Sequence, residues 1–172
     1  MKRIFLLFLI SSVFVMCKSK APHTSSPEGE KKDAIEHSKN DDLYYVEDVR
    51  NDFRSVSEQT KNKFLEGYKA TEKQYSILFF TQGFTGEQIH VKNDKGSVFK
   101  GSVITNKKTG LAKNMRILNT STNSIYDQAT KKTIFIDTKM ASQYKFVYVM
   151  KDLSNKEKPY KITYSNLLRP EQ

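Results

Sequence analysis

The stretch Tyr144-Lys145-Phe146-Val147-Tyr148-Val149-Met150 decides the fold that this sequence predicts. Apart from Lys145, its side chains are apolar or aromatic, so an extended segment here would bury both of its faces. Aromatic and β-branched residues also favour strands over helices. We therefore expect residues 144–150 to form a central strand of a sheet.

The segments on either side of this stretch alternate between apolar and polar residues, which is typical of half-buried strands. In Tyr160–Ser165, every second residue is apolar. Polar segments at 93–96 and 106–110 contain Gly and Asn and predict turns. Roughly six to eight short strands, about ten residues apart, predict an antiparallel β-sandwich or small barrel. We place this domain at residues 75–170.

The preceding segment, residues 43–74, has a helical rather than an alternating pattern. Apolar residues recur at intervals of three and four, which places them on one face of a helix. They are Val46, Val49, Phe53 and Val56, followed after a polar stretch by Phe64, Leu65 and Tyr68. One long helix or two short ones, packed against the sheet, both fit this pattern. The predicted fold class is thus mainly β with an N-terminal helical segment.

The N-terminus contains a short export-like signal. Lys2 and Arg3 precede an apolar run, Ile4–Met16, which is too short for an ordinary membrane-spanning helix. Cys17, the single cysteine of the chain, follows this run directly. A cysteine in this position resembles the signal of bacterial lipoproteins. The resemblance, limited to about residues 1–20, implies that residues 1–16 are a signal peptide and that Cys17 carries acyl chains such as palmitate.

A lipidated Cys17 implies that the mature protein is held on a membrane of the bacterial cell envelope. Residues 17–42 are polar, with Pro22 and Pro27, and predict a flexible tether. Lipoproteins exported to the cell surface resemble one another in having acidic residues after the cysteine. Lys18 and Lys20 stand there instead, which favours the periplasmic side over the cell surface.

The formal net charge of +10 raises the question of an anionic partner. The export signal argues against nucleic acid, and the lysines are scattered through predicted turns. The charge therefore indicates a solvated face or attraction to an anionic envelope surface. The sequence names no protein partner and implies no cofactor.

No catalytic or metal-binding constellation stands out. His90 is the only histidine of the predicted domain, which excludes a metal site with two His ligands. Ser97-Val98-Phe99-Lys100 and Lys108-Thr109-Gly110 match two motifs of the penicillin-binding and β-lactamase family, but the serine lies in a strand-like run rather than at the start of a helix. Glu87 and His90 would face opposite sides of a strand. The remaining candidates for a carboxylate pair are Glu87, Asp127, Asp137 and Asp152.

Five tyrosines offer the last candidate site: Tyr126, Tyr144, Tyr148, Tyr160 and Tyr164. Their alternation with polar residues favours a core face over a platform for sugar rings. We therefore expect a non-catalytic binding or structural module. The alternatives are an accessory lipoprotein that captures a glycan or other ligand, and a small envelope hydrolase. Burial of Tyr148 and Tyr164 without a pocket beside His90 would count against both.

Overall fold

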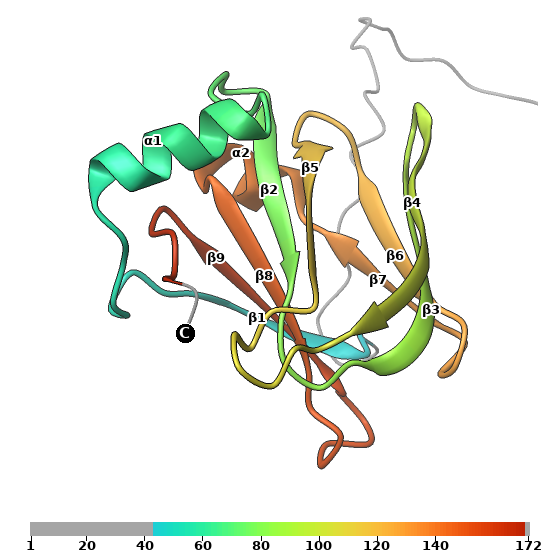
Figure 1. The fold of residues 1–172 in the computed structure, drawn as a ribbon. Helices are drawn as coiled ribbons and strands as arrows, with labels where there is room; N and C mark the ends of the chain where they lie inside the picture. The colour runs from blue at the N-terminus through green and yellow to red at the C-terminus, as the bar shows by residue number, and fades with distance from the viewer. Residues whose placement is uncertain (1–42, 171–172) are drawn as a thin grey trace, which may run out of the picture. The chain divides into compact units, whose positions relative to one another are not determined.

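The computed structural model describes residues 43–170 (Figure 1). The predicted signal peptide (1–16), the acylation site at Cys17 and the tether (17–42) lie outside the described residues. Neither helix within 43–170 is long and apolar enough to cross a membrane.

The domain is mainly β, as predicted, and consists of two sheets packed face to face. The five-stranded sheet has the order β1 (Tyr45–Val49), β9 (Tyr160–Ser165), β8 (Phe146–Lys151), β2 (Tyr75–Phe80) and β5 (Lys113–Leu118). The four-stranded sheet has the order β4 (Gly96–Ile104), β3 (Thr85–Asn93), β6 (Asn123–Asp127) and β7 (Lys132–Ile136). The two sheets stay open, so the fold is a sandwich and not a closed barrel.

The main core fills the space between the two sheets. Alternate residues of β2, β8 and β9 face the small sheet, among them Phe80, Val149 and Ile162, which are fully buried. Ile89 and Val91 of β3 meet them from the other side. Burial of alternate residues from two sheets is what the alternating sequence pattern predicts.

The opposite face of the five-stranded sheet carries a second, aromatic core. Phe79 of β2 and Phe146 and Tyr148 of β8 lie on this face, below helix α1 (Glu58–Gly67) (Figure 1). Ser57 caps α1, because its side chain accepts a hydrogen bond from the Thr60 amide. The other helix, α2 (Thr138–Gln143), is capped in the same way by Asp137. With both of its faces buried, β8 is the central strand that its sequence predicts.

Two predictions need correction. The helical prediction for 43–74 holds for Glu58–Gly67 but is wrong for Tyr45–Val49, which form β1. The five-stranded sheet is also not purely antiparallel, because β1 pairs in parallel with β9 and β2 pairs in parallel with β8. Tyr45 faces the main core at 5% exposure while Val46 is exposed, so the local period is two and not three or four.

Candidate functional site

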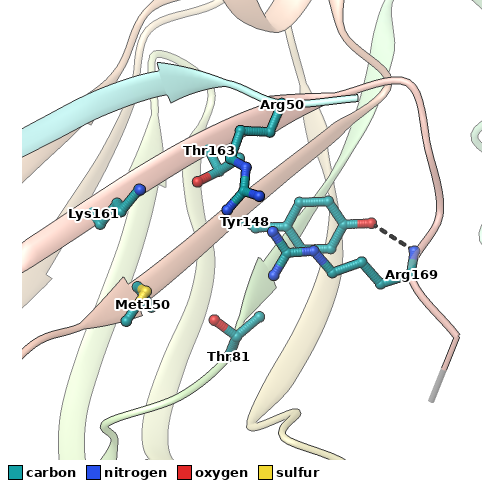
Figure 2. A pocket seen from close by; sticks show the side chains of 7 residues that line it. All are labelled: Arg50, Thr81, Tyr148, Met150, Lys161, Thr163 and Arg169. Carbon is teal, nitrogen blue, oxygen red and sulfur yellow. Dashed lines mark hydrogen bonds between the residues drawn. The ribbon is translucent and has the colours of Figure 1, made fainter. Parts of the chain in front are cut away.

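The principal candidate is a cavity on the α1 side of the five-stranded sheet, here called the α1 cavity. It has a volume of about 730 Å³ and opens to solvent. Its lining comes from the 50–56 segment, α1, β2, the 109–111 loop, β8 and the C-terminal segment: Arg50, Phe53, Arg54, Val56, Thr60, Phe64, Phe79, Thr81, Gln82, Thr109, Gly110, Leu111, Tyr148, Met150, Leu168, Arg169 and Pro170. A smaller cavity of about 100 Å³ shares five of these residues and adds Lys161 and Thr163 (Figure 2).

The floor of the α1 cavity is aromatic. The rings of Phe79 and Tyr148 stack with centroids 4.9 Å apart, and Phe64 of α1 stacks on Phe79 at 5.8 Å. Phe53 meets Tyr148 edge-on at 5.9 Å. Phe79 and Tyr148 are neighbours because β2 and β8 pair in parallel with these two residues opposite each other.

Tyr148 also fixes the C-terminal segment over this floor. Its hydroxyl donates to the Leu167 carbonyl at 2.9 Å and accepts from the Arg169 amide at 3.1 Å. Burial raises the pKa of Tyr148 to about 12, so the hydroxyl stays protonated at neutral pH. The segment 166–170 is thereby held where its side chains form one wall of the cavity.

Arg169 is the most unusual side chain of the site. Its guanidinium lies over the rings of Phe53 and Tyr148, at 4.3 and 4.5 Å from their centroids. Its buried Nε has no hydrogen-bond partner among the described residues, and no described carboxylate accepts from the guanidinium. Burial lowers the pKa of Arg169, and the nearby charge of Arg50 acts in the same direction. A cation held by aromatic rings keeps its charge available for another anion.

Further cations stand at the rim. Figure 2 shows the guanidinium groups of Arg50 and Arg169 converging near the ring of Tyr148, Arg50 from the end of β1 and Arg169 from the C-terminal segment. Arg50 forms an exposed bidentate pair with Asp52, at 3.0 and 3.1 Å. Lys161 pairs with Asp48 at 2.7 Å, and Arg54 has no ion-pair partner within the described residues. Three arginines and Lys161 thus stand against Asp48 and Asp52, so the described side chains at the rim keep an excess of positive charge, which attracts anions.

Two of the carboxylates named from the sequence do come together, but away from the α1 cavity. Glu87 and Asp127 both bind Lys151, whose Nζ lies 2.7 Å from Glu87 Oε1 and 2.9 Å from Asp127 Oδ2. The Tyr160 hydroxyl donates to the same Asp127 oxygen at 2.6 Å. The three charged side chains are at most 8% exposed. This buried cluster joins β8 and β9 of one sheet to β3 and β6 of the other.

The electrostatics of the buried cluster argue against acid–base use. Burial alone would raise the pKa of Asp127, but hydrogen bonds from Tyr160 and Lys151 outweigh it and hold the pKa below its usual range. The same balance, with Lys151 as donor, lowers the pKa of Glu87. A general acid or base works best with a pKa near the operating pH, and these groups are displaced away from it. We assign them a structural role.

The other sequence candidates are dispersed. Asp137 caps α2, and Asp152 accepts hydrogen bonds within its own turn from the Ser154 amide and hydroxyl. His90 stands on the outer face of the four-stranded sheet, 3.0 Å from Ser97 Oγ. Neither cavity borders His90.

The motif fragments are separated as well. Ser97 lies in strand β4, not at the start of a helix. Thr109 and Gly110 belong to the loop beside the α1 cavity. The first fragment therefore lies in a strand of the four-stranded sheet and the second in the loop between β4 and β5, and neither cavity is lined by Ser97 or Lys100.

Three of the five tyrosines are core residues, as the alternation indicates. Tyr148, Tyr160 and Tyr164 are buried, whereas Tyr126 is exposed. The Tyr164 hydroxyl donates to Glu47 at 2.7 Å and accepts from the Asp137 amide at 3.0 Å. Tyr148 and Tyr164 are thus buried and neither cavity borders His90, the condition that counts against a tyrosine platform and against a hydrolase built on His90. Tyr148 nevertheless lines the α1 cavity, a site that the sequence did not predict.

The arginines of the site were not predicted from the sequence. Arg50 and Arg54 appear as alternating charges on a helix surface, and Arg169 lies in the segment after the last predicted strand. Their residue type was a usable signal, because most of the positive charge of this chain comes from lysine, whereas these three cations are arginine. Arginine is the preferred cation for bidentate anion recognition and for stacking on rings.

Among residues 43–170, no group of three or more His, Cys, Asp or Glu side chains is close enough to hold a metal ion. No protein-family model matches this chain, and a search of curated proteins finds no relative of it.

Proposed function

We propose that this chain is a lipid-anchored binding protein of the bacterial cell envelope that captures a small ligand in the α1 cavity without transforming it. The observation that carries this proposal is the cavity itself, with an aromatic floor and polar groups at its rim. Its volume of about 730 Å³ falls within the range of small-molecule sites, about 300–1,000 Å³.

A non-catalytic role is supported by the chemistry of the lining. The cavity presents arginines, threonines, glutamine and apolar groups, but no Asp, Glu, His, Cys or Lys. Glu87 and Asp127, the carboxylates that do converge, are bound by Lys151 inside the sandwich. These features favour retention of a ligand over acid–base or nucleophilic chemistry.

Ligand capture is tested with a fluorescent reporter in the cavity. The chain contains no Trp, so Phe53→Trp creates a single emitter that preserves an aromatic ring beneath Arg169. With the full-length protein in phosphatidylcholine vesicles, decanol below its solubility limit should shift the emission saturably.

The matched control is Phe135→Trp, which places the emitter at an exposed position on the four-stranded sheet. Its emission should not respond. Equal responses of both reporters would indicate non-specific partitioning, and a silent Phe53→Trp reporter would refute capture in the cavity.

The envelope assignment rests on the lipoprotein-like signal and has its own test. Intact mass of the protein from the membrane fraction should give a chain beginning at Cys17 with added acyl chains. Cys17→Ala should lose both the processing and the added mass. An unmodified chain that retains residues 1–16 would contradict the lipid anchor.

A further inference from the structure

The rim of the α1 cavity carries more positive charge than the described residues neutralise. Arg169 has no carboxylate partner, and Arg54 has no ion-pair partner within residues 43–170. Within the described residues, the Arg50 guanidinium pairs with the exposed Asp52, and solvent exposure leaves it accessible to a further acceptor.

Arg169 has the geometry of a preorganised anion receptor. Its guanidinium carbon lies 4.3 and 4.5 Å from the ring centroids of Phe53 and Tyr148, two rings that are perpendicular to each other, and its backbone amide donates to the Tyr148 hydroxyl. These contacts restrict where the guanidinium can lie. A guanidinium carries parallel N–H groups that match the two oxygens of a carboxylate or phosphate. The buried Nε has no hydrogen-bond partner among the described residues, so an acceptor on a ligand would satisfy it.

Next to this charge, the cavity is apolar. Val56, Leu111 and Leu168 lie with the rings of Phe64 and Phe79 along the lining beneath α1. A ligand that satisfies both regions has an anionic head and an apolar tail.

We infer that the α1 cavity takes an acidic amphiphile, whose carboxylate or phosphate head binds Arg169 and Arg50 and whose apolar tail lies along the Phe64 and Phe79 side. This inference rests on the proposed ligand-capture function and specifies its substrate class. Arg169 is the principal recognition residue, and Arg50 supplies the second cation.

The test compares ligands of equal tail length in the Phe53→Trp protein, reconstituted at full length in phosphatidylcholine vesicles. Decanoate and decyl phosphate should bind about tenfold or more tightly than decanol, because a hydrogen bond to a charged group is worth about 1.5–3 kcal/mol. Decyltrimethylammonium should bind more weakly than decanol. Comparison of decanoate with decyl phosphate separates a carboxylate head from a phosphate head.

Arg169→Gln should abolish the preference for decanoate over decanol. The matched control is Arg116→Gln, since Arg116 also stacks on a ring, that of Tyr75 at 4.4 Å, but lies outside the cavity. The control should retain the preference. Arg50→Gln tests the same head-group site at an exposed position, so the test remains decisive if Arg169→Gln does not fold. It should lower the affinity for decanoate several-fold and leave the affinity for decanol unchanged.

The outcomes separate the two proposals. If decanol and decanoate bind equally and neither arginine substitution matters, the cavity still captures ligands but the acidic head group is wrong. If no amphiphile shifts the Phe53→Trp emission, both proposals fail.

Discussion

At the scale of single residues, Gly83 shows how closely the chain segments approach one another. It lies between β2 and β3 with φ of +87°, and a Cβ there would stand 1.8 Å from the Lys151 carbonyl oxygen. That carbonyl belongs to the backbone of β8, which cannot move without disturbing the buried cluster. Only glycine fits this conformation and this contact.

Gly83→Ala should therefore destabilise the protein by about 2–4 kcal/mol, through backbone strain and the forced displacement of β8. Urea unfolding followed by circular dichroism measures the change. Gly67→Ala is the control, because a Cβ there has nothing within 4 Å and the residue ends α1. A Gly83→Ala protein as stable as the Gly67→Ala protein would show that β8 yields easily.

At the scale of elements, α1 depends on its cap as well as on its packing. Ser57 Oγ accepts from the Thr60 amide at 3.2 Å and lies 2.9 Å from Thr60 Oγ1. Leu65 is the one buried residue of the helix. Because Thr60 and Phe64 form a wall of the α1 cavity, fraying of the first turn would open that wall.

Ser57→Ala should lower the free energy of unfolding by about 1 kcal/mol, while Ser57→Asp, which can still cap the helix, should leave it unchanged. Chemical denaturation measures both values. Equal losses for the two variants would mean that the hydroxyl acts through something other than capping.

The elements also show where sequence patterns carry the fold. Strands such as β8 and β9 are predictable because their side chains alternate or are apolar on both faces, which is a local property. β1 is not, because Val46, Val49, Phe53 and Val56 satisfy a helical spacing by coincidence. Its strand state depends on parallel pairing with β9, more than 100 residues away in the chain.

The α1 cavity escaped prediction for the same reason. It forms only when the 50–56 segment and the C-terminal segment meet on the aromatic face of β8, and the sequence of neither segment indicates this contact. Glu87 and Asp127 could be named as candidates from the sequence. Their common partner Lys151 could not, since a charged residue at the end of an apolar strand has no signature of burial.

At the scale of the whole molecule, the buried cluster that joins the two sheets makes the stability of the fold depend on pH. The pKa values of Glu87 and Asp127 are lowered in the folded state, so their contribution to stability is present above their unfolded pKa and is lost as pH falls through the acid range. The pKa of Lys151 is raised, so its contribution is lost only at strongly alkaline pH. Stability should be flat near neutrality and fall below about pH 4.

In Lys151→Met, the loss of stability relative to the wild type should be greatest at neutral pH and smallest in acid. Two buried carboxylates would lose their cation, costing about 3–5 kcal/mol at neutral pH, and the loss should shrink as acid protonates them. Urea midpoints across the acid and neutral range measure the trend. Lys161→Met, which removes a half-exposed pair with Asp48, should cost at most about 1 kcal/mol. A Lys151→Met protein with the wild-type pH profile would contradict the role assigned to the cluster.

The parallel pairing of β1 with β9 has a mechanical consequence. When residues 43 and 170 are pulled apart, the segment after β9 detaches first, and the force then acts on the start of one strand and the end of its neighbour. The two strands are drawn past each other in shear, so all the hydrogen bonds between Tyr45–Val49 and Tyr160–Tyr164 bear the load together. Strands of a hairpin pulled from their open end would instead separate one bond at a time. The domain is therefore built to withstand tension applied along its own chain.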